Sequence, residues 1–135
     1  MPNYKSKLER VNANHLEDHK VSYLYEPSEG KIQYVLPASK HTYTPDFWLE
    51  TKRGRIICVE TKGIWDYTDR YKHVWIKKLY PDLDIRFVFT RSATKTSKGA
   101  KQCYADICEG RGRGVFKGLT WQYADKKIPL EWMNE

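Results

Sequence analysis

The spacing of apolar residues near the start of the chain predicts a helix over residues 6–19. Ser6 and Glu9 have the Ser-x-x-Glu spacing of a capping box, in which side chains satisfy free N–H groups of the first helical turn. Apolar side chains then recur near one face of this helix, namely Leu8, Val11 and Leu16. We therefore expect the chain to begin with an amphipathic helix.

Alternating apolar and polar residues predict strands after this helix. Residues 21–26 and 32–36 are rich in β-forming side chains, and a turn signal, Pro-Ser-Glu-Gly, separates them. We expect these two strands to pair with each other as a hairpin. Residues 44–51 predict a further strand with Pro45 at its start, where a proline is tolerated.

The next strand is predicted over residues 55–62, after a turn at residues 52–54. Its centre is continuously apolar, which is typical of a strand covered on both faces. A helix at 67–80, ended by Pro81, and a strand at 84–90 follow. We then expect a helix at 99–109, a Gly/Arg-rich loop at 110–118 and a helical turn at 128–135. This order predicts a mixed α/β domain.

The composition bounds the class of protein. A chain of 135 residues with 40% hydrophobic and 30% charged residues is neither disordered nor embedded in a membrane. It has no apolar run near the roughly 20 residues that span a bilayer, and its first ten residues lack the apolar core of a secretory signal. Cys58, Cys103 and Cys108 form no Cys-x-x-Cys pair, so we expect reduced thiols rather than disulfides or a zinc site.

The net charge indicates a polyanionic partner. Lysine and arginine number 24 against 17 acidic residues, a formal charge of +7, which favours nucleic acid over a merely solvated basic surface. The longest basic stretch lies between Asp84 and Asp106, where no acidic residue occurs. The candidate phosphate contacts are Arg91, Lys95, Lys98 and Lys101 in this stretch, with Arg70 and Lys72 on the second predicted helix.

Three ionisable residues on two neighbouring predicted strands form the candidate site. Asp46 opens one strand and Glu60 and Lys62 close the next, with thirteen residues between the two acids. Because side chains alternate along a strand, Glu60 and Lys62 project to the same side, and the intervening turn returns Asp46 toward them. Two carboxylates and an ammonium suit phosphodiester hydrolysis, in which Mg²⁺ binds carboxylates and a lysine stabilises developing charge. The same residues also occur on ordinary solvated strand ends.

Two longer runs around these residues carry a resemblance. Residues 34–47 (YVLPASKHTYTPDF) and 59–66 (VETKGIWD) resemble the endonuclease I family of bacteriophages, which are Holliday-junction resolving enzymes of the PD-(D/E)xK nuclease superfamily. The resemblance continues through residues 81–89 (PDLDIRFVF) and 123–132 (YADKKIPLEW), and so covers nearly the whole chain.

This resemblance implies a restriction-endonuclease-like α/β fold, with a mixed β-sheet flanked by helices, and a Mg²⁺ cofactor that Mn²⁺ can replace. It implies that Asp46, Glu60 and the carbonyl of Thr61 bind metal, and that Lys62 is the catalytic lysine. The family also uses a glutamate on the first helix. Glu17 sits in the more similar local sequence, but the spacing to the following strand favours Glu9.

The resemblance further implies a homodimer in which residues 1–36 are exchanged between subunits across a bridge at residues 37–40. Glu9 of one chain would then complete the site of the other, and the two sites would nick a four-way or otherwise branched DNA junction in pairs during DNA recombination. The sequence alone favours an ordinary loop at residues 37–40. The resemblance places the protein in the cytoplasm of an infected bacterium.

Three alternatives stay open at this point. The protein is either this resolving enzyme, another PD-(D/E)xK restriction or repair nuclease, or a non-catalytic DNA-binding protein that retains a relict site. The intact set of Asp46, Glu60 and Lys62 disfavours the last. In the Gly/Arg-rich loop, Arg111, Arg113 and Lys117 either contact DNA or solubilise a mobile loop.

Overall fold

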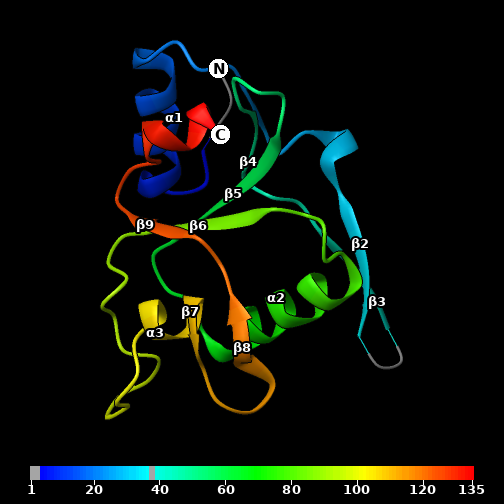
Figure 1. Cartoon of the computed structure of the whole chain (residues 1–135), viewed down its shortest axis with the longest axis vertical. Coiled ribbons are helices and arrows are strands. Elements are labelled where there is room, and N and C mark those ends of the chain that lie inside the picture. The colour runs from blue at the N-terminus through cyan, green and yellow to red at the C-terminus, as the bar shows by residue number, and fades with distance from the viewer. Residues whose placement is uncertain (1–3, 37–38) are drawn as a thin grey trace.

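A five-stranded mixed sheet forms the centre of the computed structural model, which describes residues 4–36 and 39–135 (Figure 1). The strand order is β1-β4-β5-β6-β9. Pairing is antiparallel from β1 to β5 and parallel from β5 to β9. The strands are β1 (Tyr23–Tyr25), β4 (Phe47–Glu50), β5 (Ile56–Lys62), β6 (Ile85–Phe89) and β9 (Tyr123–Asp125).

Helices cover both faces of this sheet, as the resemblance implied. Helix α1 (Lys7–Asp18) and the C-terminal 3₁₀ turn (Leu130–Asn134) lie on one face, and α2 (Tyr67–Leu79) and α3 (Tyr104–Cys108) lie on the other (Figure 1). Strand β5 contributes to both layers, because Ile57 and Val59 pack toward α1 whereas Cys58 packs toward α2. Its buried run therefore belongs to a central strand covered on both sides, as predicted.

Helix α1 begins where the sequence predicts. The Ser6 hydroxyl accepts a hydrogen bond from the N–H of Glu9 at 3.1 Å, which satisfies one free donor of the first turn. In a capping box the Glu9 carboxylate would accept from the N–H of Ser6. It accepts instead from the N–H of Lys5, one residue earlier, at 3.3 Å. Leu16 is fully buried against the sheet.

The predicted hairpin between residues 21–26 and 32–36 is wrong. Strand β1 pairs with β4, with Tyr23 opposite Leu49 and Tyr25 opposite Phe47. Strand β2 (Ile32–Leu36) pairs with β3 (Ser39–Tyr43) in a separate two-stranded sheet that projects beside α2 (Figure 1). Of the predicted bridge at residues 37–40, the first two residues lie outside the described residues and the last two belong to β3.

Two further predictions are corrected in the second half of the chain. The helix expected at 99–109 is confined to α3, because Asp106 accepts a hydrogen bond from the N–H of Cys103 and so sets the helix start there. The expected loop at 110–118 contains strand β7 (Glu109–Arg111), a 3₁₀ turn (Gly114–Phe116) and the start of β8 (Lys117–Thr120). Arg111 is held by ion pairs to Asp106 and Glu109.

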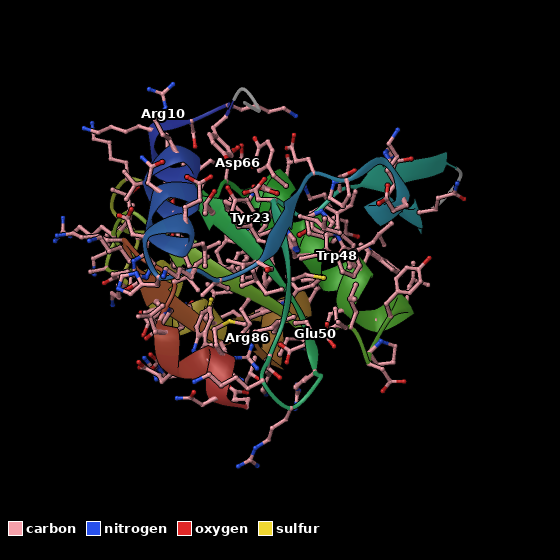
Figure 2. All side chains as sticks on the ribbon, turned by 90° about the horizontal axis from the view of Figure 1, so that it is seen from above. Arg10, Tyr23, Trp48, Glu50, Asp66 and Arg86 are labelled. Atoms are coloured by element: carbon pink, nitrogen blue, oxygen red, sulfur yellow. The ribbon has the colours of Figure 1, made fainter. Side chains whose placement is uncertain are left out.

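The C-terminal 3₁₀ turn is fastened to the sheet by a buried arginine. Arg86 on β6 is fully buried, and its guanidinium donates to the carboxylates of Asp84 and Glu135 at 2.7–3.0 Å. It also lies over the ring of Trp132. Figure 2 shows Arg86 inside the body of the molecule, whereas Arg10 points outward from α1.

Helix α1 is joined to the chain just before this turn by the buried side chain of Asn12. Its amide donates to the carbonyl of Lys126 and accepts from the N–H of Ile128, and the His15 ring bonds the carbonyl of Ile128. The three cysteines are free. Within residues 4–36 and 39–135, every helix is too short or too polar to cross a bilayer.

Candidate active site

An open polar cleft of about 500 Å³ lies where β4 begins and β5 ends. Glu60 and Lys62 reach it from the sheet face that carries Cys58 and α2, in agreement with the predicted alternation. Glu9 reaches it from α1, on the opposite face, and Asp46 precedes the first residue of β4. The cleft is lined by Lys5, Glu9, Glu26, Lys31, Thr42, Tyr43, Thr44, Asp46, Glu60, Thr61, Lys62 and Lys72.

Asp46 and the end of β5 hold each other through reciprocal hydrogen bonds. The N–H of Asp46 donates to Oε1 of Glu60 at 3.0 Å. In return, Oδ2 of Asp46 accepts from the N–H and the hydroxyl of Thr61 at 2.9 and 2.8 Å. These bonds bring together the two carboxylates that the sequence placed on separate strands.

Burial makes the charged forms of both carboxylates costly. Asp46 and Glu60 are only 7% and 5% exposed. Burial, followed by the charge of Glu60, raises the pKa of Asp46 to about 8 although Thr61 donates to it. Burial also raises the pKa of Glu60, and the nearby charges of Lys62 and Lys72 oppose the shift. The cleft therefore concentrates unfavourable negative charge that a cation would relieve.

Lys62 lies between two carboxylates. Its Nζ is 3.3 Å from Oε2 of Glu60 and 2.5 Å from Oδ2 of Asp69, at the start of α2. Burial acts to lower the pKa of Lys62, but the charges of Glu60 and Asp69 outweigh it and raise that pKa. The ammonium is thus held in its charged form between Glu60, which lines the cleft, and Asp69.

The other side of the cleft is formed by Glu9 and Glu26. One oxygen from each, with one from Asp46, lies within 4.8 Å of the others. Tyr25 donates its hydroxyl hydrogen bond to Glu9. Glu26 has a φ of +40°, a left-handed conformation unusual for glutamate, and its N–H donates to the carbonyl of Asp46 at 3.1 Å.

This donor set fits a hard divalent cation. Mg²⁺ prefers carboxylate oxygens and is held by few of them, which matches three acids gathered in an open cleft. The ammonium of Lys5 already lies 3.2 Å from Oε2 of Glu26, and the charges of Glu9 and Asp46 add to the rise in its pKa. The field of the cleft is therefore attractive to cations.

Of the two candidate helix glutamates, the structure places Glu9 in the cleft. Glu9 is 7% exposed. Glu17 is exposed two turns further along α1 and accepts a hydrogen bond from the hydroxyl of Tyr23 at 2.8 Å. The preference for Glu9 that came from spacing agrees with these positions.

The six candidate DNA contacts lie in different environments. Arg70 is 6% exposed, and its guanidinium donates to the main-chain carbonyls of Trp65 and Thr96, so it is turned inward. Lys72 is half-buried, lines the cleft, pairs with Asp69 at 3.1 Å and lies over the ring of Tyr43. The four exposed residues are Arg91, Lys95, Lys98 and Lys101.

Three residues of the site were not predicted from the sequence: Lys5, Glu26 and Asp69. Glu26 ends the strand predicted at residues 21–26, so a search for acids at strand ends, rather than for one motif, would have found it. Asp69 lies three residues after the N-cap Asp66, a place where an acid ordinarily favours the helix start. No sequence signal distinguishes it from such a residue.

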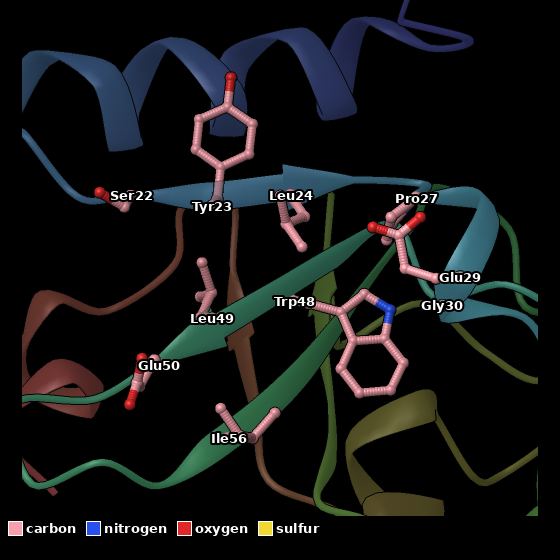
Figure 3. A pocket seen from close by; sticks show the side chains of 10 residues that line it. All are labelled: Ser22, Tyr23, Leu24, Pro27, Glu29, Gly30, Trp48, Leu49, Glu50 and Ile56. Atoms are coloured by element: carbon pink, nitrogen blue, oxygen red, sulfur yellow. The ribbon is translucent and has the colours of Figure 1, made fainter.

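A second hollow, an apolar groove of about 470 Å³, lies along β1 and β4 (Figure 3). Leu24 and Ile56, which line it, are 53% and 48% exposed. Trp48 projects into it from β4 in Figure 3. None of the residues that line this groove is among the candidate site residues, so the polar cleft remains the candidate active site.

The arrangement of this cleft is typical of a nuclease, with Asp, Glu and Lys side chains gathered at the ends of two neighbouring strands of a mixed sheet. The family model for phage endonuclease I matches residues 1–135. Endonuclease I of Escherichia phage T7 is 44% identical over 132 residues, which are 98% of this chain and 79% of the T7 protein. Endodeoxyribonuclease 1 of Enterobacteria phage T3 is 39% identical over 132 residues, 98% of this chain and 78% of its own. The chain belongs to the phage endonuclease I family.

Proposed function

We propose that this protein is a Mg²⁺-dependent endodeoxyribonuclease that resolves four-way (Holliday) and other branched DNA junctions by paired nicks. The observation that carries the proposal is the cleft in which Glu60 contacts both Asp46 and Lys62, and Glu9 lies close to Asp46. A net charge of +7 supports binding to a DNA backbone. We place this activity in the cytoplasm of the infected bacterium.

The residues of the cleft divide into two roles in this proposal. Asp46, Glu60, Glu9 and the carbonyl of Thr61 would hold the metal, with Glu26 as a further carboxylate beside Glu9 and Asp46, and Mn²⁺ can take the place of Mg²⁺. When bound, the ion supplies Lewis-acid stabilisation of charge on the phosphate and lowers the pKa of a coordinated water. Lys62 orients the attacking water and stabilises the negative charge that develops on the phosphate. Its ammonium is held at the end of β5 by Glu60 and Asp69.

Substrate selection is assigned to phosphate contacts rather than to base reading. Lys72 lines the cleft and is positioned to meet the scissile strand. The further candidate phosphate contacts are the exposed basic residues after β6, namely Arg91, Lys95, Lys98 and Lys101. Such contacts position a duplex without reading its sequence, and branch preference then depends on DNA shape and deformability.

We further propose a homodimer in which residues 1–36 are exchanged and residues 37–40 form the bridge. The separation of β2 and β3 from the main sheet supports this, because β2 pairs with β3 and with no strand of the main sheet among the described residues. In the exchanged dimer, the contacts that Glu9 makes with Asp46 would form between chains. Two equivalent sites would then act on opposite strands of one junction.

Cleavage of a four-way junction beside a linear duplex of matched sequence tests the activity. We expect Mg²⁺-dependent paired nicks in the junction only, and expect Asp46→Asn protein to bind the junction without cutting it. Cutting of linear duplex at defined sequences would instead indicate a restriction or repair nuclease. Binding without metal-dependent cutting of any branched substrate would indicate a non-catalytic junction-binding protein.

A mixing experiment tests the exchanged dimer. A Glu9→Ala chain and an Asp46→Asn chain are each expected to be inactive alone. Refolded together, they would form heterodimers in which one site has Glu9, Asp46 and Glu60 intact, so single nicks should return. A mixture that stays inactive would place each site within one subunit.

A further inference from the structure

Asp69 is the acidic residue in the first turn of α2, and it lies close enough to the end of β5 to contact Lys62. Its position is set locally by the helix start. The Asp66 carboxylate caps α2 and accepts a hydrogen bond from the N–H of Asp69 at 2.9 Å. The first helical turn thus holds the Asp69 main chain at a fixed place beside the cleft.

The Asp69 carboxylate joins two lysines. Oδ2 lies 2.5 Å from Nζ of Lys62, and Oδ1 lies 3.1 Å from Nζ of Lys72. The side chains of Lys62, Asp69 and Lys72 are 16%, 19% and 26% exposed, so solvent screens these pairs less than it does surface pairs. The contact to Lys62 is shorter than the 3.3 Å contact that the same ammonium makes with Glu60.

Glu60 alone would hold Lys62 poorly. One oxygen of Glu60 already accepts from the N–H of Asp46, which leaves Oε2 for the ammonium. A lysine side chain is a flexible four-carbon stem, so a single partner at 3.3 Å allows it to turn away from the cleft. A second carboxylate on a different element fixes the ammonium between β5 and α2.

Asp69 has no evident use in binding DNA. A carboxylate beside a cleft that receives phosphates repels the substrate, and it also occupies Lys72, one of the candidate phosphate contacts. Its presence therefore opposes affinity. An acid here favours the start of α2, and its contact with Lys62 adds a second role, directed at the cleft.

We propose that Asp69 is a positioning residue that holds the ammonium of Lys62 against Glu60 for phosphodiester cleavage. The inference rests on the proposed nuclease function, since it assigns how the catalytic lysine is oriented. Asp69 acts through Lys62 and does not contact the substrate.

Asp69→Asn and Asp66→Asn form a matched pair of variants. Each removes one negative charge near the start of α2, but Asp66 makes no ion pair with Lys62 and asparagine still caps a helix. We expect single-turnover cleavage of a junction to slow about 10- to 100-fold in Asp69→Asn, the range that misplacement by about 1 Å produces. Junction affinity in EDTA should stay equal or become tighter, because a repulsive charge is lost.

Slower cleavage with unchanged or tighter binding is the result expected of a positioning residue. Loss of a merely structural residue would weaken binding and cleavage together. Asp69→Glu keeps the charge but moves it by one methylene, so it should recover part of the rate, and it carries the test if Asp69→Asn fails to fold. Equal cleavage rates for Asp69→Asn and wild type would overturn the inference.

A readout without DNA checks the contact itself. Peptide-level labelling with an amine-reactive anhydride should modify Lys62 several-fold faster in Asp69→Asn than in wild type or Asp66→Asn. Equal labelling would overturn the inference even if the proposed nuclease activity holds. Failure of the proposed function looks different, because the wild-type protein itself would then cut no branched DNA. That result would overturn the inference as well.

Discussion

Replacing Asp46 by asparagine should stabilise the metal-free protein while it removes cleavage. The side chain is 7% exposed, and burial, followed by the charge of Glu60, raises its pKa from 3.8 to about 8. Between these two values the folded state keeps a proton that the unfolded chain has lost. The free energy of unfolding therefore falls as the pH rises from about 4 to about 8.

The magnitude follows from the size of the shift. Each pKa unit is worth about 1.4 kcal/mol, so a shift of about four units sets an upper limit near 5–6 kcal/mol at pH 8. Because the cleft is open to water on one side, we expect a smaller gain of about 2–4 kcal/mol for Asp46→Asn at pH 8. Asparagine retains an oxygen that accepts from Thr61, so the hydrogen bonds of the site are kept.

Urea unfolding in EDTA, followed by tryptophan fluorescence, measures this gain. The variant should exceed wild type at pH 8 and approach it at about pH 3, below both pKa values, where the aspartate is protonated in the folded and the unfolded state. Asp82→Asn, an exposed change just after α2, controls for loss of one negative charge. An Asp46→Asn protein no more stable than wild type at pH 8 would refute the reasoning, and so would a gain that is independent of pH.

Three further predictions concern the cleft and the C-terminal anchor. Lys62→Ala should lower the single-turnover cleavage rate about 10²- to 10³-fold and leave junction affinity within about tenfold in gel shifts; full cleavage would exclude Lys62 from the chemistry. Glu9→Gln should abolish most junction cleavage whereas Glu17→Gln cuts at the wild-type rate, and the reverse order would exchange their roles. Arg86→Ala should lower the free energy of unfolding by about 3–5 kcal/mol, because it leaves Asp84 partly buried with only Arg55. Arg55→Ala, which removes an exposed partner of the same carboxylate, should cost less than about 1 kcal/mol in the same urea titration, and equal losses would contradict the role of burial.

The helices and the central strand were predicted because their signals are local. Ser6 caps α1 through a residue three positions away, and Pro81 follows the end of α2 by two residues. The continuous apolar run of β5 reports burial on both faces directly. The same period of two placed Glu60 and Lys62 on one side, and the reciprocal bonds to Asp46 then follow from the antiparallel pairing of β4 with β5.

Strand partners were not predictable in the same way. The turn signal that ends at Gly30 suits a hairpin, but this segment forms a 3₁₀ turn. Strand β1 instead pairs with β4, and the rings of Tyr23 and Tyr25 pack on the ring of Phe47, with centroids 5.4 and 5.7 Å apart. These contacts join residues more than twenty positions apart. Strand β9 has three residues, too few for alternation to be recognised, and the contact of Asp69 with Lys62 depends on how α2 lies against the sheet.

The bonds between α1 and the segment before the C-terminal turn have a consequence for the order of folding. The side chains of Asn12 and His15 bond the main chain at Lys126 and Ile128, more than 110 positions later. Contacts this distant in sequence form late, because the entropy of closing a long loop is spent before they form. Helix α1 carries Glu9, so we expect the carboxylate cluster to take its final arrangement only once residues 126–128 have docked on α1. A chain still being translated is then expected to hold α1 through its packing on the sheet alone, without these hydrogen bonds.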